Sequence, residues 1–354
     1  MPTALHRVAA LAAAIAALCA APASAATRSD PDLSQQWALR GDGPMGAASA
    51  WARATAGAVT VAVVDTGVDL SHPDLAPNLW TNPGEIPGNG IDDDADGIVD
   101  DVHGADLLNN DGDPRDDNGH GTHVAGIIAA RGDNGIGVAG VAWRARIMAV
   151  KVLDANAAGD MSAVARGVRY AVAHGARIVN VSLSGPRPGA DIVGALDEAR
   201  AAGVVVVAAA GNGGADLDVT PAYPAALDEP NLVTVTASNR RGGLAPKASY
   251  GRTTVDLSAP GTDIASTAAG GGYELRSGTS TAAAEVSGAL ALLTGARPTL
   301  GSDALRAALL TTARPTSIPV ADGALDIGAA MRRVLGRGRS RSSARTARAS
   351  GRGR

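Results

Sequence analysis

Aromatic side chains and cysteines are scarce in this 354-residue chain, which has four Trp, four Tyr, no Phe and one Cys. A core without these groups has to be built from Val, Leu, Ile and Ala. Charged residues make up 19% of the chain and hydrophobic residues 45%, a balance that excludes a generally disordered protein. After residue 25 no apolar run reaches the length of a membrane helix, about 18 residues, so we expect no transmembrane segment.

Acidic residues are absent from the last part of the sequence. Residues 332–354 contain nine Arg and no Asp or Glu, and subtracting this +9 from the net charge of −4 leaves −13 for the rest of the chain. The bulk charge therefore indicates no nucleic-acid partner. Residues 336–354 contain only Gly, Arg, Ser, Ala and Thr, so we expect a disordered tail with at most weak contact to anionic surfaces.

The first 25 residues have the pattern of an export signal. A short start carrying Arg7 precedes an apolar run, Val8–Ala21, and an A-x-A cleavage site at residues 23–25. The alternative is a buried Ala-rich helix. Cys19 lies within this run, so the mature chain has no cysteine and no disulfide. We expect a secreted protein, extracellular or periplasmic, that is a monomer.

Short β-rich runs alternate with segments of helical spacing between residues 26 and 335. The strands are expected near residues 59–64, 147–152, 178–183, 204–209 and 232–236, and the helices near residues 162–174, 195–202, 280–294 and 302–310. The strand runs have little polar interruption, as in strands covered on both faces. The alternation predicts an α/β fold with a doubly wound, mostly parallel sheet, and the lack of a Pro- or Ser-rich linker indicates one domain.

Three short segments carry reactive side chains. Asp65 ends an apolar run and is therefore expected at the carboxyl end of a strand, where α/β sheets hold their functional sites. The alternative is that Asp65 is a cap or turn residue, which is the more common role of an Asp at the end of a strand. His120 lies among glycines before a helical stretch, and the absence of a Glu between His120 and His123 excludes a zinc-protease motif. Ser280 follows a glycine-led turn into a helix, where backbone N–H groups favour negative charge; a helix N-cap is the alternative.

The order Asp, His, Ser along the chain is that of the subtilisin triad. The motifs DTGVD from residue 65, HGTHVAG from residue 120 and GTS-x-A from residue 278, with a buried run that ends at Asn212, resemble the subtilase family of serine peptidases. The resemblance extends from about residue 31 to residue 327, and it is strongest to the thermitase-like, calcium-binding members. It implies a subtilisin-like fold, polypeptide substrates and serine endopeptidase activity.

The resemblance also implies a role for each catalytic residue. Ser280 would attack the peptide carbonyl, His120 would take its proton as general base, and Asp65 would orient the imidazole and stabilise its charged form. Asn212 and the backbone N–H of Ser280 would stabilise the oxyanion. His123, three residues further along the same helix, is expected to be structural.

Substrate is expected, by the same resemblance, to lie as an extended strand between two edges. The residues expected to form these edges and the walls of the first specificity pocket are Ser182, Leu183 and Ser184 on one side and Ala209, Ala210 and Gly211 on the other. Uncharged walls favour an apolar substrate side chain over Lys or Arg. Ser184 stands where the family usually has Gly, which narrows the expected pocket entrance.

An acidic insertion at about residues 82–117 precedes His120 and has 11 Asp among residues 89–117. Carboxylates at this density repel one another unless a cation or water separates them, so a solvated acidic loop is the alternative to a metal site. Residues 92–97 have the D-x-D-x-D-G spacing of a calcium loop, but His103 stands where an EF-hand has its closing Glu.

We predict two structural calcium sites in this insertion. The candidate ligands of the first site are Asp92, Asp94, Asp96 and Asp101, with Asp100 as an alternative. The candidate ligands of the second site, by resemblance to the thermitase-like calcium loop, are Asp106, Asn109, Asp111 and Asp113. Calcium would supply the crosslinking that disulfides do not provide.

Three further features depart from the family pattern. Thr281 stands where the family usually has Met, and Ala284 where it usually has Pro. Because Ala suits a helix interior better than Pro, the helix is expected to persist. The peptidase body is expected to begin directly after the signal, without the propeptide that is common in the family. The competing hypothesis is a secreted calcium-dependent pseudo-peptidase or binding module without an activated serine.

Overall fold

The computed structural model describes residues 30–41, 43–189 and 191–336. The predicted export signal, and the predicted tail beyond residue 336, lie outside the described residues. In the described part of the chain, no helix combines the length and the apolar character needed to cross a bilayer.

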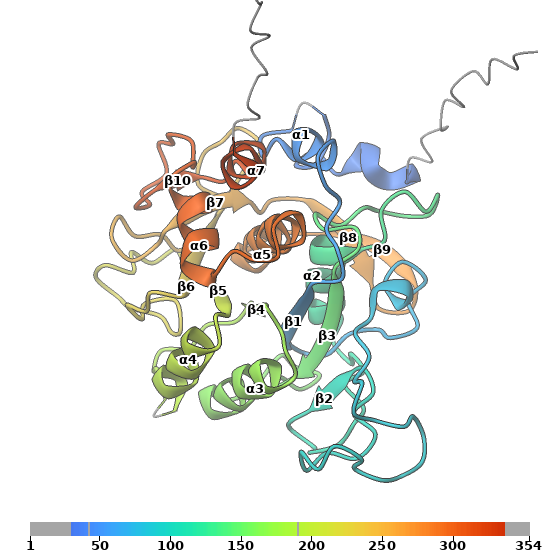
Figure 1. Cartoon of the computed structure of the whole chain (residues 1–354). Helices are drawn as coiled ribbons and strands as arrows, with labels where there is room; N and C mark the ends of the chain where they lie inside the picture. Colours follow the sequence, from blue (N-terminus) through green and yellow to red (C-terminus); the bar gives the residue numbers. More distant parts are fainter. Residues whose placement is uncertain (1–29, 42, 190, 337–354) are drawn as a thin grey trace, which may run out of the picture.

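A sheet of eight strands occupies the centre of the molecule (Figure 1). Its spatial order is β10-β7-β6-β5-β4-β1-β3-β2, and all neighbouring strands are parallel. The strands are β1 (Thr60–Asp65), β2 (Gly104–Asp106), β3 (Arg146–Lys151), β4 (Ile178–Val181), β5 (Val205–Ala209), β6 (Leu232–Ser238), β7 (Leu257–Pro260) and β10 (Gly323–Ala324). A separate antiparallel hairpin pairs β8 (Ile264–Ala268) with β9 (Gly272–Arg276). The predicted α/β class with a mostly parallel sheet is confirmed.

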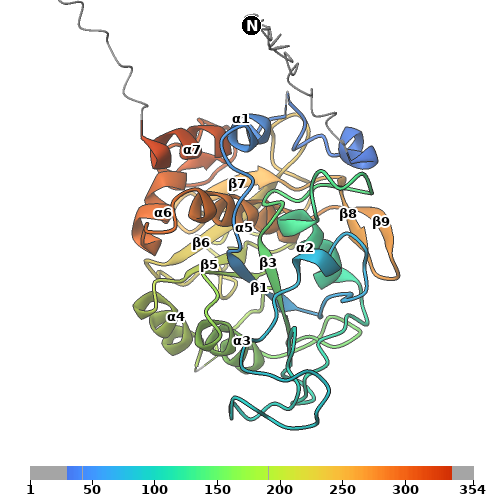
Figure 2. The same cartoon turned by 45° about the vertical axis from the view of Figure 1, so that its right-hand side comes forward.

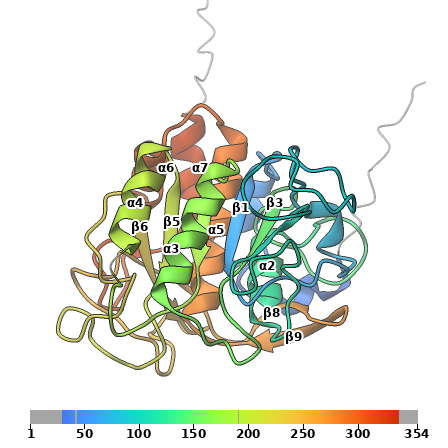
Figure 3. The ribbon, with the colours of Figure 1, turned by 90° about the horizontal axis from the view of Figure 1, so that it is seen from below.

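Helices cover both faces of this sheet. They are α1 (Ala47–Trp51), α2 (His120–Ala129), α3 (Met161–Ala173), α4 (Ile192–Ala201), α5 (Thr279–Ala296), α6 (Ser302–Leu310) and α7 (Ile327–Leu335), and short 3-10 turns lie at Pro31–Gln35 and Ala76–Asn78. Alternate residues of β1 belong to different cores, since Val61 and Val63 pack with α2 and α5, whereas Ala62 and Val64 pack with α3 and α4. Figure 3 shows α3 and α4 side by side on their face.

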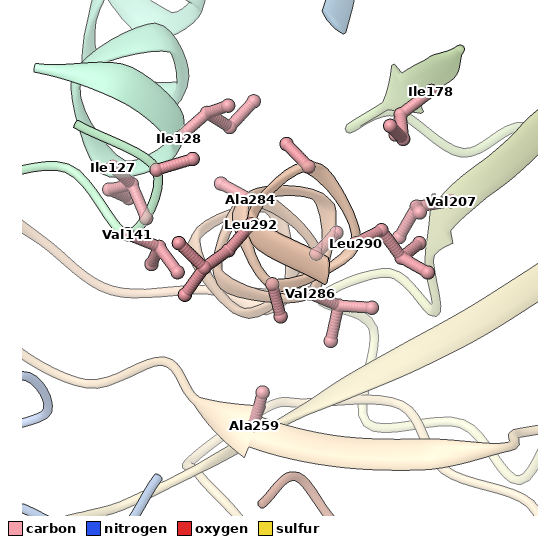
Figure 4. Close-up of a cluster of buried hydrophobic side chains, with 14 of the residues drawn as sticks. Ile127, Ile128, Val141, Ile178, Val207, Ala259, Ala284, Val286, Leu290 and Leu292 are labelled. Carbon is pink, nitrogen blue, oxygen red and sulfur yellow. The ribbon is translucent and has the colours of Figure 1, made fainter. Parts of the chain in front are cut away.

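Helix α5 is buried on all sides, and every residue from Thr279 to Thr294 is buried. Figure 4 shows it surrounded by Ile127 and Ile128 of α2 and by Val207 of β5. Small Ala side chains at many of its positions allow this close packing in a chain that has few aromatic groups. The helix runs without interruption through Ala284, as expected for Ala in place of Pro.

The acidic insertion forms a lobe beside β2, at the lower end of the views in Figures 1 and 2. Apart from β2 it consists of turns, in which carboxylates accept hydrogen bonds from backbone N–H groups. Asp100, for example, accepts from the N–H groups of Gly88, Asn89 and Gly90. The lobe leads directly into α2.

Some elements were missed by the sequence patterns. The strand β9 is largely accessible to solvent and therefore has no apolar run, and β10 has only two residues. The helix α7 follows its N-cap residue Asp326, whose carboxylate accepts the N–H of Ala329 at 2.7 Å. It packs against α1 at the upper edge of the molecule (Figure 2).

Glu285 is an ionisable side chain inside the apolar helix α5, and it is 1% exposed. Burial raises its pKa well above the ordinary 4.5. Its Oε2 atom has no hydrogen-bond partner among the described residues. The fold therefore favours the neutral, protonated acid.

We expect Glu285→Gln to remove a pH dependence of stability. Below the unfolded-state pKa of 4.5, both states hold the proton and the stability is complete. As the pH rises toward the higher folded pKa, the unfolded state loses its proton first, and the free energy of unfolding falls by about 1.4 kcal/mol per pH unit. Urea unfolding of both proteins from about pH 5 to pH 8 measures this slope. Glu198→Gln, at an exposed ion pair, is the control; equal slopes in wild type and Glu285→Gln would contradict the expectation.

Candidate active site

The predicted catalytic side chains lie at the carboxyl edge of the central sheet. Asp65 is the last residue of β1, His120 is the first residue of α2, and Ser280 lies in the first turn of α5. The strand β4 lies between β1 and β5, and helices α2 and α5 pack against each other. Parallel pairing therefore brings residues from three distant segments to one edge.

Asp65 and His120 form a direct pair in which Nδ1 of His120 lies 2.7 Å from Oδ1 of Asp65. A carboxylate oxygen only accepts, so Nδ1 carries the hydrogen and Nε2 is left as the basic nitrogen. The negative charge of Asp65 raises the pKa of His120, against the opposing effects of burial and of the positive charge of Arg276. Asp65 itself is fully buried, and its Oδ1 also accepts the backbone N–H of Thr66 at 2.7 Å.

Two glycines allow the strand end and the helix start to approach this closely. A side chain at Gly121 would overlap the carbonyl oxygen of Gly67, and Gly67 has a φ of 107°, in the region that favours glycine. The glycines around the motifs at Asp65 and His120 are therefore required by contact between the two segments.

Asp116, at the end of the acidic insertion, fastens the same two segments. Its carboxylate accepts hydrogen bonds from the hydroxyl of Thr66 at 2.8 Å and from the hydroxyl of Thr122 at 2.5 Å. Burial opposes its charge, but hydrogen bonds from Thr122 and from the N–H of Gly119 lower its pKa. The sequence patterns did not identify this role, because Asp116 is one of many carboxylates in the insertion.

Asn212 is held with its amide oxygen occupied. Its Oδ1 accepts the N–H of Thr279 at 2.9 Å and the hydroxyl of Thr279 at 3.2 Å. The Thr279 hydroxyl in turn accepts the N–H of Gly211 at 3.0 Å. Because the oxygen is used in this way, the Nδ2 hydrogens are the groups that Asn212 offers to a ligand, as expected for an oxyanion donor.

The hydroxyl of Ser280 donates to the carbonyl oxygen of Ser182 at 3.0 Å. It must leave this acceptor before it can transfer its proton to His120, and such rearrangement is common in sites without substrate. Ser280 is 9% exposed. Its position at the start of a long buried helix places it among free backbone N–H groups.

The six predicted substrate-binding residues lie at two neighbouring strand ends. Ser182, Leu183 and Ser184 follow β4, whereas Ala209, the last residue of β5, is followed by Ala210 and Gly211. A Cβ atom at Gly211 would lie 3.0 Å from Oγ of Ser184. The two segments thus approach each other at Ser184, where the narrow entrance was expected.

A hollow of about 680 Å³ adjoins the edge formed by Leu183 and Ser184. Leu153, Met161 and Val164 contribute apolar surface to it. The hollow thus borders two of the six predicted substrate-binding residues.

His123 has the contacts of a structural residue. Burial lowers its pKa to about 4. The ring is therefore neutral near pH 7, and its Nε2 lies 3.1 Å from the carbonyl oxygen of Ile264 in β8. This contact joins α2 to the β8–β9 hairpin.

The candidate ligands of the first predicted metal site lie close to two residues that the sequence patterns missed, Glu85 and His174. Ligand atoms of Glu85, Asp92 and Asp94 lie within 4.8 Å of one another, as do those of Asp94, Asp96 and His174. Glu85 precedes the Asp-rich run, and His174 lies at the end of α3, so only the fold brings them to the loop. Asp101 instead accepts from Asn82 at 2.7 Å and from the hydroxyl of Tyr170. Burial raises the pKa of Asp101 to about 6.

The second predicted metal set is engaged in local contacts. Asp106 accepts the side-chain amide of Asn109 at 2.8 Å, Asp111 accepts the N–H of Asp113 at 3.0 Å, and Asp113 pairs with Arg115 at 2.8 Å. Within the described residues, the close groups of acidic and imidazole ligand atoms include none from this set. The geometry therefore favours the first set.

The buried Asp–His pair, the serine at a helix start and the oriented amide all lie at the carboxyl edge of a parallel α/β sheet. The model of the subtilase family matches residues 56–350, and the chain belongs to this family. Over 219 residues the chain is 42% identical to a thermophilic serine proteinase of a Bacillus strain, covering 62% of this chain and 48% of that protein. It is 38% identical to thermitase of Thermoactinomyces vulgaris, covering 66% of this chain and 74% of thermitase.

A solved structure of a protease from Pseudoalteromonas arctica has the same fold. It is 28% identical, has a TM-score of 0.73, and the match covers 87% of this chain and 99% of that one. The chain spans about half the length of the Bacillus proteinase, 48%, and 38% of a subtilisin-like protease from Plasmodium vivax to which it is 34% identical.

Replacement of Asp65 by Asn should lower the pKa of His120. The carboxylate charge is the largest contribution that raises this pKa, and an amide keeps only a dipole. NMR titration of the imidazole signals measures the change. Asp160→Asn, at the N-cap of α3, is the matched control and should leave the titration of His120 unaltered. An unchanged midpoint in Asp65→Asn would show that the pair is not electrostatically coupled.

Proposed function

We propose that this protein is a secreted serine endopeptidase that hydrolyses peptide bonds in polypeptide substrates. The observation that carries the proposal is the 2.7 Å contact of Asp65 with His120, at the edge where Ser280 and Asn212 also lie. The polar groups of this edge fit the distinct tasks of base, base orienter, nucleophile and oxyanion donor.

The reaction begins with Ser280. Its hydroxyl is too weakly acidic to attack an amide unaided, so His120 takes the proton at Nε2 as Oγ bonds to the substrate carbonyl carbon. Asp65 holds the hydrogen of Nδ1 and stabilises the imidazolium that forms. Since the buried carboxylate is in place before substrate arrives, its orientation requires no rearrangement during the step.

The negative charge on the substrate carbonyl oxygen is stabilised by the Nδ2 group of Asn212 and by the backbone N–H of Ser280. His120 then returns its proton to the leaving amine, and the acyl-enzyme is hydrolysed by water through the same base. In this scheme Thr279 is a positioning residue, because it holds the amide oxygen of Asn212 away from the oxyanion.

We also propose that calcium binds to the acidic insertion as a structural ion. Glu85, Asp92 and Asp94 supply oxygen ligands only, which is the chemistry that calcium prefers. When bound, the ion would offset the repulsion among the carboxylates of the lobe. We further propose that residues 1–25 direct export of the protein. The Arg-rich tail is proposed to make weak contact with anionic surfaces.

The serine mechanism predicts that Ser280→Ala and His120→Ala each reduce peptide hydrolysis by about 10⁵–10⁶-fold, and that the double variant loses little more. The effects are not additive because the two residues act as a unit. Digestion of a fluorogenic peptide library measures the rates, and a fluorophosphonate probe should label wild type but not Ser280→Ala. Ser34→Ala, at an accessible serine of the 3-10 turn Pro31–Gln35, is the control.

A wild-type protein that folds but neither labels nor cleaves would support the competing hypothesis of a pseudo-peptidase. Substantial hydrolysis by Ser280→Ala would exclude the serine mechanism.

Calcium binding predicts that an excess of chelator lowers the melting temperature and makes residues 89–117 susceptible to proteolysis. A ligand that binds only the folded state stabilises by about 2.7 kcal/mol at a hundredfold excess over Kd. The double variant Asp92→Asn and Asp94→Asn should reproduce most of this loss, and Asp111→Asn with Asp113→Asn should have a smaller effect. If chelation and both double variants leave melting unchanged, the insertion is a solvated acidic loop.

A further inference from the structure

Arg276 lies beside the catalytic histidine, although it is distant from it in sequence. It is the last residue of β9, four positions before Ser280. A Cβ atom at Gly119 would lie 3.1 Å from Nη2 of Arg276, so the guanidinium is against the residue that precedes His120. Figures 1 and 2 show the β8–β9 hairpin next to α2, which carries His120.

The guanidinium is available to a ligand. Its Nε donates to Glu274 at 2.8 Å, and the side chain is 30% exposed. Within the described part of the chain, the terminal Nη groups have no hydrogen-bond acceptor. Its charge reaches the site, because Arg276 opposes the effect of Asp65 and Asp116 on the pKa of His120.

The order of steps in the proposed reaction indicates which part of the substrate lies near Arg276. Ser182 and Ala209 mark the two substrate edges, at the ends of β4 and β5. His120, on the β1 side of these strands, gives its proton to the leaving amine. The residues that follow the cleaved bond therefore begin on the side of His120, where Arg276 is located.

We propose that Arg276 is a specificity-determining residue that favours Asp or Glu immediately after the cleaved bond. The planar guanidinium can present both Nη groups to a carboxylate, and a Lys in the same place would be repelled. Glu274 weakens this preference, because it shares the same cation. The inference rests on the proposed peptidase function and names a class of substrate for it.

Matched quenched peptides that differ only in having Glu, Ala or Lys after the cleaved bond test the proposal. Wild type should cleave the Glu peptide with a kcat/KM about fivefold above that of the Lys peptide, as expected for a partly exposed charge pair. Arg276→Gln should bring this ratio close to one, and Arg276→Glu should invert it. Glu274→Gln should increase the ratio, and high salt should reduce it in wild type.

Arg169→Gln is the matched control, since Arg169 also pairs with a glutamate, Glu198 at 3.0 Å, but between α3 and α4. It should leave the ratio unchanged. If wild type and Arg276→Gln cleave the Ala peptide but have the same Glu to Lys ratio, Arg276 does not set specificity and this inference is overturned. If a folded wild type cleaves none of the peptides, the proposed peptidase function itself fails.

Discussion

Parallel pairing of β1, β4 and β5 determines where the functional side chains lie. In the register of the sheet, Val64 of β1 is opposite Val181 of β4, and Val181 is opposite Ala208 of β5. The next residues along the chain, Asp65 of β1, Ser182 just after β4 and Ala209 of β5, are therefore at the same level. A shift of one residue in either pairing would turn every side chain of the shifted strand to the other face and separate the base orienter from the substrate edges.

The sequence predicted the central strands well and drew attention to the motifs that carry the candidate catalytic residues, because both leave local signals. Buried parallel strands are apolar on both faces, and the close contact of Gly67 with Gly121 requires glycine within two of the motifs. The hairpin of β8 and β9 was not predicted, since β9 is largely accessible and the buried strand β8 is interrupted by the polar residues Ser266 and Thr267. Glu85 and His174 were not predicted as possible ligands, because they meet the Asp-rich run only through the tertiary fold.

The acidic insertion is connected to the site through hydrogen bonds as well as through the chain. Asp116 joins Thr66, which follows Asp65, to Thr122, which lies in the first turn after His120. The remaining carboxylates mostly accept backbone N–H groups within the lobe, so their charges organise turns locally. The lobe thus contains a cluster of carboxylates whose negative charges repel one another, and one further carboxylate, Asp116, that holds β1 against α2.

The burial of α5 links the nucleophile to the most protected part of the molecule. Its residues from Thr279 to Thr294 pack against both the sheet and the surrounding helices, so exposing the helix requires disruption of the main hydrophobic core. Backbone amides in such an element exchange with solvent only when the whole domain unfolds. The backbone of Ser280 is therefore expected to keep its position until this core opens, so that loss of the nucleophile's position follows loss of the core rather than movement of a surface loop.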